Sequence, residues 1–159
     1  MSSTDLDPVQ IAAAADRLAV VEALYRFAAG VDRRDWDMFA SAIAETVVSD
    51  FGPASAKAGF HYPVIEGREN LIAALWGLLA PFDTSHSVSN PLVTINGDTA
   101  RLDALVEAQH VPRNDPSRHY LMKNRYDVEL ARQGDGWVIT RNTVDNIWRS
   151  GDVTVMAGV

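Results

Sequence analysis

The stretch Val31–Trp36, which reads VDRRDW, ends a long amphipathic helix and places a carboxylate where the apolar pattern predicts the core. At about 100° per residue, the side of the helix that carries Asp32 is otherwise apolar. Its apolar members, all within about 40° of Asp32 on the helix wheel, are Leu18, Val21, Tyr25 and Ala28. We therefore expect Asp32 to point inward, at a helix C-terminus whose macrodipole disfavours negative charge. A buried acid there needs a cationic or hydrogen-bonding partner, and the partner that the sequence offers is His86.

The composition fits one globular domain, with 159 residues of which 47% are hydrophobic and 22% charged. The formal net charge of −7 argues against nucleic acid as a partner, because phosphate binding needs clustered Lys and Arg. The absence of cysteine excludes disulfides, thiolate metal sites and thiol nucleophiles. We expect a single domain over 1–159. Residues 1–7 are expected as a flexible tail, and 152–159 either as a flexible tail or as a cover for a pocket mouth or a neighbouring subunit.

No apolar run in the sequence approaches the length needed to span a bilayer, so no membrane partner is expected. The N-terminal residues Met1–Asp5 lack the basic and apolar regions of a secretory signal. These two features predict a cytoplasmic protein.

The first half of the chain is predicted to be mainly helical. Apolar residues at helical spacing indicate a helix over 11–31, with a break near Asp16, and a second helix over 36–44 that Asp35 caps. A short strand over 47–51 follows. Prolines and glycines indicate that residues 52–66 form a loop that rims a pocket. A further helix over 68–79 ends before Pro81.

The second half of the chain changes to the alternation of β-strands. Short strands are predicted over 85–89 and 92–95, and Asn96–Asp98 (NGD) is a strong hairpin signal. Apolar and polar residues then alternate over 100–110 and 120–130, which places His110 in an inward-facing row. A final long strand covers 137–148. Helices followed by long strands indicate an α+β fold, with the helices packed on one face of a curved antiparallel sheet.

A series of short motifs resembles the SnoaL-like group of the nuclear transport factor 2-like superfamily over nearly the whole chain. The motifs are Gly30–Trp36 (GVDRRDW), Glu66–Arg68 (EGR), Thr84–His86 (TSH) with Asn90, Asn96–Ala100 (NGDTA) and Gly136–Arg141 (GWVITR). The resemblance implies a cone-shaped α+β barrel, in which a bent sheet wraps against helices and an apolar pocket opens at one end. The group is similar to scytalone dehydratase, hexachlorocyclohexane dehydrochlorinase, bile-acid dehydratases and polyketide cyclases.

The resemblance also implies roles for four residues. An aspartate at the position of Asp32 orients a histidine at the position of His86, and that histidine is the base. A second histidine of scytalone dehydratase resembles His110, and an arginine of the dehydrochlorinase resembles Arg141. Oligomers are common in this superfamily, so a homo-oligomer is expected as well.

Two positions depart from the family pattern. Val31 stands where scytalone dehydratase has a tyrosine, and Phe27 stands where the dehydrochlorinase has a lysine. The Asp–His pair is kept, whereas the groups that assist a leaving group differ. The resemblance therefore does not fix the substrate.

An elimination reaction requires catalytic groups that these residues could supply. The reaction needs a base near neutral pKa and a donor for the departing group, and imidazole is the natural base. A buried carboxylate at Nδ1–H would fix the tautomer of His86 and stabilise the imidazolium that forms. The candidate donors to an enolate or leaving group are His110, Asn124, Tyr126 and Arg141.

We predict a cofactor-independent lyase of dehydratase type that acts on a small, largely apolar, cyclic substrate. The side chains expected to bind that substrate are Tyr25, Phe39, Phe51, Trp76, Met122, Asn124, Tyr126 and Trp148. One alternative is a polyketide cyclase or ketosteroid-type isomerase that uses the same base. Another is a non-catalytic ligand-binding or oligomer-forming module, in which Asp32 and His86 form only a buried ion pair.

The sequence predicts neither a metal nor a cofactor. The four histidines have no metal-ligand spacing, and the glycines are isolated at turns rather than gathered in a phosphate-binding loop. A Gly-x-Ser-x-Gly nucleophile turn is also missing, which argues against a serine hydrolase.

Overall fold

The computed structural model describes residues 7–158. Helices occupy most of the first half of the chain and long strands the second half, as the sequence pattern predicts. The elements in order are α1 (Pro8–Arg33), α2 (Trp36–Ala42), β1 (Ile43–Asp50), α3 (Gly52–Lys57), β2 (Ile65–Glu66), α4 (Arg68–Leu79), β3 (Phe82–Asn96), β4 (Thr99–Pro112), β5 (Tyr120–Gln133), β6 (Gly136–Gly151) and the 3₁₀ helix η1 (Val153–Gly158).

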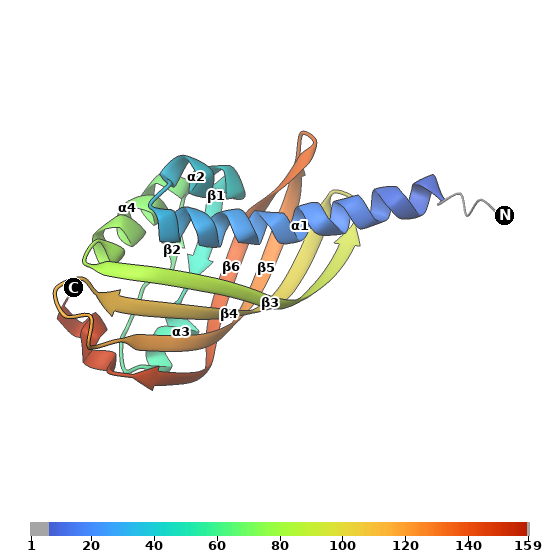
Figure 1. Cartoon of the computed structure of the whole chain (residues 1–159). Coiled ribbons are helices and arrows are strands. Elements are labelled where there is room, and N and C mark those ends of the chain that lie inside the picture. The colour runs from blue at the N-terminus through green and yellow to red at the C-terminus, as the bar shows by residue number, and fades with distance from the viewer. Residues whose placement is uncertain (1–6, 159) are drawn as a thin grey trace.

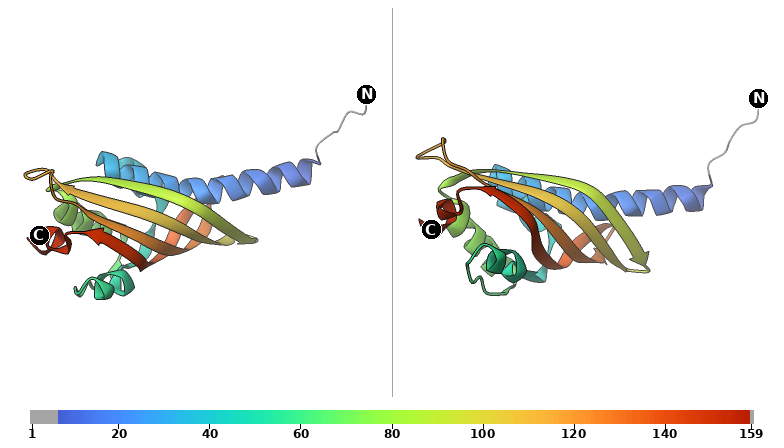
Figure 2. Two further views of the ribbon diagram at one scale, coloured as in Figure 1. Left: turned by 60° about the horizontal axis from the view of Figure 1, so that its bottom comes forward. Right: turned by 90° about the horizontal axis from the view of Figure 1, so that it is seen from below.

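One curved sheet carries the fold, with its strands in the order β2-β1-β6-β5-β4-β3. Figures 1 and 2 show α1 lying along one face of this sheet. The predicted α+β class, with helices packed on a curved sheet, is confirmed. Two details differ, because β1 runs parallel to β6 and the sheet does not close into a barrel. A short hairpin forces two strands to pair antiparallel. Because β1 and β6 are distant in sequence, no hairpin joins them and they can pair in parallel.

Helix α1 is continuous, so the break predicted near Asp16 is wrong. Residues 12–15 are all alanine, the best helix former, and Asp16 points away from the helix to Arg132 of β5. The Arg132 guanidinium donates to both carboxylate oxygens of Asp16, at 3.0 and 2.8 Å. Asp7 caps the first turn by accepting the Val9 N–H at 3.0 Å. The helix is therefore held at its start and on the sheet.

The buried stripe of α1 is rotated from the predicted one. Leu24 and Phe27 are buried, whereas Leu18 and Tyr25 are exposed at 63% and 45%. The prediction placed every apolar residue of α1 on the buried side. The sheet covers only the side of α1 that faces the sheet, and residues 8–18 are almost all exposed. Asp32 consequently lies at the edge of the buried stripe rather than at its centre, with a side chain that is 20% exposed.

Two segments have more regular structure than the sequence predicted. The predicted loop over 52–66 contains α3 and the short strand β2. The two predicted strands over 85–89 and 92–95 are one strand, β3, whose pairing with β4 is irregular between Ser89 and Leu92. Asn90 takes a left-handed backbone there (φ 52°), which asparagine tolerates better than most residues. The helix predicted over 68–79 is confirmed.

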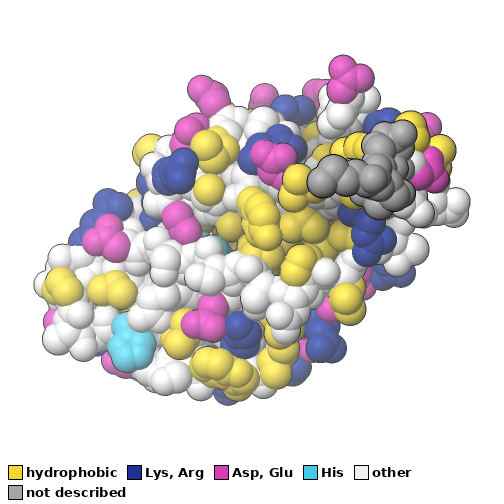
Figure 3. All heavy atoms as spheres, turned by 45° about the vertical axis from the view of Figure 1, so that its right-hand side comes forward, with side chains coloured by type: hydrophobic (Ala, Val, Ile, Leu, Met, Phe, Trp, Pro, Cys, Tyr) yellow, Lys and Arg dark blue, Asp and Glu magenta, His cyan; other side chains and the backbone are white. Residues whose placement is uncertain are grey.

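Apolar side chains gather on the face at the N-terminal end of α1, which Figure 3 shows. The exposed large apolar side chains of this helix are Val9, Ile11, Leu18 and Tyr25.

Within residues 7–158, no helix is long and apolar enough to cross a membrane.

The end of α1 packs closely on α2 at Gly30. A Cβ added to Gly30 would lie 2.7 Å from the Phe39 nitrogen and 2.8 Å from its Cα and Cβ. Because two of these three atoms belong to the backbone, a side-chain rotation cannot relieve the overlap. The glycine therefore allows the two helices to approach, just before the VDRRDW stretch.

We expect Gly30→Ala to lower the free energy of unfolding by about 1–3 kcal/mol, the usual cost of overpacking. Gly77→Ala is the matched control in α4, because no atom lies within 4 Å of a Cβ built there. It should raise stability by about 0.5–1 kcal/mol through helix propensity. Urea unfolding of both variants checks this pair, and a Gly30→Ala variant as stable as Gly77→Ala would contradict the close packing.

Candidate active site

A largely apolar cavity of about 360 Å³ lies between the sheet and the helices. Its lining residues are Phe27, Val31, Phe51, Ala54, Ser55, Ala58, Phe60, His61, Tyr62, Leu75, Leu78, Leu79, His86, Ala108, His110, Tyr120, Met122, Asn124, Tyr126, Val144 and Met156. None of them is Asp, Glu, Lys or Arg. Among residues 7–158, no group of three or more His, Cys, Asp or Glu is arranged to hold a metal ion.

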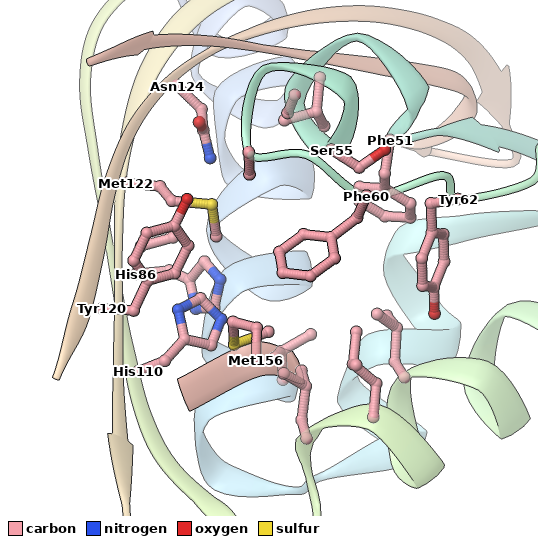
Figure 4. A pocket seen from close by; sticks show the side chains of 18 of the residues that line it. Phe51, Ser55, Phe60, Tyr62, His86, His110, Tyr120, Met122, Asn124 and Met156 are labelled. Carbon is pink, nitrogen blue, oxygen red and sulfur yellow. The ribbon is translucent and has the colours of Figure 1, made fainter. Parts of the chain in front are cut away.

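His86, His110, Tyr120 and Asn124 lie on one side of the cavity, and Phe51, Ser55, Phe60 and Tyr62 lie on the other, as Figure 4 shows. His86, His110 and Tyr120 come from strands β3, β4 and β5. Phe51 and Phe60 come from the segment around α3 and face them across the cavity. A ligand in this cavity would thus meet both buried histidines on the sheet side and a mostly aromatic surface on the other side.

The side chain of Asp32 lies behind His86 and binds it at two points. Oδ1 is 2.6 Å from the ring Nδ1, and Oδ2 accepts the backbone N–H of His86 at 2.6 Å. Thr84 donates its hydroxyl to Oδ1 at 3.0 Å. Burial by itself would raise the pKa of Asp32, but these bonds outweigh it and lower that pKa below the usual value. The carboxylate is therefore ionised at neutral pH, and Nδ1 carries the hydrogen that it accepts.

His86 keeps its second ring nitrogen free for the cavity. Its side chain is only 9% exposed and lines the cavity wall. Within the described residues, Nε2 makes no hydrogen bond. With Nδ1 donating to Asp32, the neutral ring carries its lone pair on Nε2, which is the form that a general base needs.

His110 is buried beside His86, with ring centroids 6.1 Å apart and the rings nearly perpendicular. Burial, together with the nearby His86, lowers the pKa of His110 to about 4. Its Nδ1 is buried and has no hydrogen-bond partner among residues 7–158. The ring is neutral at physiological pH and can still exchange a hydrogen bond with a ligand.

Tyr120 and Asn124 add polar groups to the same wall. The Tyr120 hydroxyl is buried with no partner in the described part of the chain, and burial raises its pKa. The Asn124 Oδ1 accepts from Asn146 Nδ2 at 2.9 Å, which leaves its NH₂ group directed into the cavity (Figure 4). Both side chains are thus set to donate to an acceptor in the cavity.

The structure brings together most of the residues that the sequence proposed for the site. Asp32 holds His86 from behind. The proposed residues that line the cavity are His86, His110, Phe51, Met122, Asn124 and Tyr126.

Two residues proposed on β6, Arg141 and Trp148, do not line the cavity, because the register of that strand shifts twice. Its pairing with β5 is irregular near Glu129 and again near Lys123. Arg141 pairs with Glu129 and Trp148 with Lys123, and both side chains are exposed. Alternation continued from the buried Trp137 and Ile139 would turn Arg141 inward, and alternation continued from the buried Val144 and Asn146 would turn Trp148 inward.

Three residues proposed on the helices also lie elsewhere. Tyr25 is exposed on the outer side of α1. Trp76 is exposed on α4 and packs against Trp36, with ring centroids 5.5 Å apart. Phe39 is fully buried in the core against Phe27, at 4.7 Å. Their apolar character indicated burial or contact, but it did not say with what.

Sequence reasoning missed several lining residues. Tyr120 stood in the predicted inward row of its strand, so the alternation could have identified it. Phe60, His61 and Tyr62 lie in the segment that is predicted only to rim a pocket. Met156 belongs to η1, which folds against the cavity. No local sequence pattern predicts that the segment 60–62 and Met156 line the cavity.

Comparison with known proteins adds a family and a fold. The family model described as the SnoaL-like domain matches residues 12–143. The terrestric acid biosynthesis cluster protein E of Penicillium crustosum is 30% identical over an aligned length of 156, and the alignment covers 93% of this chain and 94% of that protein.

Two solved structures share the fold. A candidate scytalone dehydratase from Novosphingobium aromaticivorans is 16% identical, with a TM-score of 0.72 over 84% of this chain and 85% of that one. A hexachlorocyclohexane dehydrochlorinase of type 2 is also 16% identical, with a TM-score of 0.75 over 90% of this chain and 93% of that one. At these identities the likeness shows the architecture alone.

We expect stability to fall by about 2 kcal/mol between pH 7 and pH 5 through His110 alone. The pKa of His110 is lowered to about 4 in the folded state, so the unfolded chain takes up the proton first as the pH falls. Urea unfolding at both pH values measures the loss.

The substitution His110→Gln should remove this part of the pH dependence, and His119→Gln, at an exposed loop position, should keep it. An unchanged pH dependence in His110→Gln would show that another group causes the loss.

Proposed function

The chain belongs to the SnoaL-like domain family, and on that premise we propose that it is a cofactor-independent lyase in which His86 acts as the general base. The observation that carries this proposal is the 2.6 Å contact between Asp32 and the Nδ1 of His86, on the wall of an apolar cavity. A histidine satisfied only by structural contacts would not need a cavity at its other nitrogen.

In the proposed reaction, His86 Nε2 removes a proton from a carbon atom of the substrate. The electron pair of that C–H bond forms the new double bond, and the leaving group departs from the neighbouring carbon with its bonding pair. The ionised Asp32 stabilises the imidazolium that forms at His86. The imidazolium then returns its proton to the departing group or to solvent, which restores the base.

The donors to the departing group or to a developing enolate are proposed to be His110, Tyr120 and Asn124. They lie on the same wall as His86, and within residues 7–158 the His110 Nδ1 and the Tyr120 hydroxyl have no hydrogen-bond partner. Tyr126 lines the cavity too, and burial raises its pKa, so its hydroxyl is also protonated at neutral pH. These groups take the place of the tyrosine and lysine that the sequence lacks at Val31 and Phe27.

The proposed substrate is a small, neutral, cyclic molecule with at least one oxygen or halogen. A charged substrate would be poorly held, because no lining residue is a permanent cation or anion. The volume of about 360 Å³ lies near the lower end of the range of small-molecule pockets. A cyclase or isomerase would use the same base, and product analysis distinguishes it from a lyase.

We also propose that the protein is a cytoplasmic homo-oligomer. The exposed apolar side chains Val9, Ile11 and Leu18 on α1 support assembly, because such groups are commonly covered by a second subunit. Sedimentation equilibrium should give a multiple of the chain mass of 17.4 kDa. A purely monomeric protein at micromolar concentration would overturn the proposed oligomer. A membrane-bound fraction of the protein would overturn the proposed cytoplasmic location.

We expect His86→Ala to lose turnover by a factor of about 10²–10⁴, the usual contribution of a general base. The assay follows a panel of neutral cyclic hydroxyketones and chlorinated cycloalkanes, with double-bond formation as the signal. The turnover of Asp32→Asn should fall by a similar factor, because the substitution leaves the Nδ1 of His86 without its carboxylate partner.

Exposed His119 supplies the control, and His119→Ala should keep full turnover. Thermal shift should show that His86→Ala still folds and binds. A His86→Ala variant with unchanged turnover would exclude the proposed base, and a variant that only loses stability would favour a non-catalytic module.

A further inference from the structure

The Asp32 carboxylate is joined through Thr84 to the guanidinium of Arg34. Arg34 Nη1 lies 3.1 Å from the Thr84 hydroxyl, and that hydroxyl lies 3.0 Å from Asp32 Oδ1. Neither Thr84 nor Arg34 lines the cavity. We propose that Thr84 and Arg34 are positioning residues that hold Asp32, and through it the imidazole of His86. This inference rests on the proposed function of that pair.

The chemistry of the two donors fixes the direction of the hydrogen bonds. Arginine has only donors, so Arg34 must occupy a lone pair of the Thr84 oxygen. The single hydroxyl hydrogen of Thr84 then points to Asp32 Oδ1, its acceptor in the described structure. Thr84 is locked as a donor to the carboxylate, and the side chain of Asp32 cannot rotate without losing that bond and two bonds to His86.

Arg34 also offsets the negative ends of two helices. Its guanidinium donates to the backbone oxygen of Val31 in the last turn of α1 and, at 2.8 Å, to that of Leu79 at the end of α4. A further bond of 2.8 Å reaches the Phe82 oxygen at the start of β3. Both helix C-termini carry partial negative charge, which would otherwise act on Asp32.

The backbone of Arg34 makes this geometry available. It is the C-cap of α1, in a left-handed conformation with φ 56°, and its N–H bonds to the oxygens of Gly30 and Val31. The chain turns back at this point, so the long side chain reaches β3 while Asp32, two residues earlier, faces the same strand.

Few other charged side chains lie near Asp32 and Arg34. Among the described residues, the Asp32 carboxylate bonds only to His86 and Thr84. The charge of Arg34 also interacts with the charges of Asp83 and Arg113, which form an exposed ion pair of their own at 2.8 Å. Arg34 is thus the permanent cation that is linked by hydrogen bonds to the carboxylate.

The test compares Thr84→Val with Thr84→Ser and Arg34→Gln with Arg33→Gln. Serine keeps the hydroxyl, and Arg33 is the exposed neighbour of Arg34, so the second member of each pair is a matched control. The ¹³C titration of the Asp32 carboxyl is followed by NMR in the full-length protein. Thr84→Val and Arg34→Gln should each move its midpoint upward by about one pH unit, because a donor or a cation is lost.

Turnover gives the second measurement. Thr84→Val and Arg34→Gln should lower kcat about tenfold with little change in KM, since neither residue touches the cavity, and both controls should match the wild type. A merely structural role would change the unfolding midpoint without the titration shift. Should Arg34→Gln fail to fold, Thr84→Val still decides the question.

The two proposals fail in different ways. An unchanged Asp32 titration and an unchanged kcat in Thr84→Val overturn the positioning role, even where His86→Ala is inactive. A shifted titration in a protein whose His86→Ala variant is fully active supports the hydrogen-bond chain and overturns the proposed base instead.

Discussion

A carboxylate at the C-terminal end of α1 is the constraint on which the site depends. The helix end is electrically unfavourable for it, and the position is partly buried, so its charge must be balanced by hydrogen bonds. The balance comes from β3, where His86 and Thr84 supply three donors to Asp32. An interaction between the end of the first long helix and the first long strand therefore determines where the imidazole stands.

The surrounding fold fixes the distance between these two elements. The Asp16–Arg132 ion pair holds the first half of α1 to β5, and the missing side chain at Gly30 lets α2 pack closely against its last turn. With α1 fixed at both places, Asp32 meets β3 at a constant position. Preorganisation of this kind is what a general base requires, because small displacements of a catalytic group are costly.

The cavity contains buried polar atoms that have no hydrogen-bond partner in the described part of the chain. A buried hydroxyl or ring nitrogen without a partner destabilises the folded state by about 1–3 kcal/mol. Two such atoms, on His110 and Tyr120, lie on the cavity wall beside His86, and the others in the described residues lie outside the cavity, on Trp36, Ser49, Gln109 and Asn142. A ligand that formed hydrogen bonds with these two groups would remove that cost.

The sequence alone determined that helices precede long strands, the α+β class, and the approach of Asp32 to the buried side of α1, because these follow from local periodicity and from the few places where a charge interrupts it. Tertiary structure decided which apolar residues meet the cavity. Two register shifts in β6 turn Arg141 and Trp148 outward, the sheet covers only one side of α1 and leaves Tyr25 exposed, and η1 brings Met156 to the cavity. The bond from Arg34 to Thr84 joins residues 50 positions apart. Contacts of that kind depend on how whole elements pack, and no window of neighbouring residues records them.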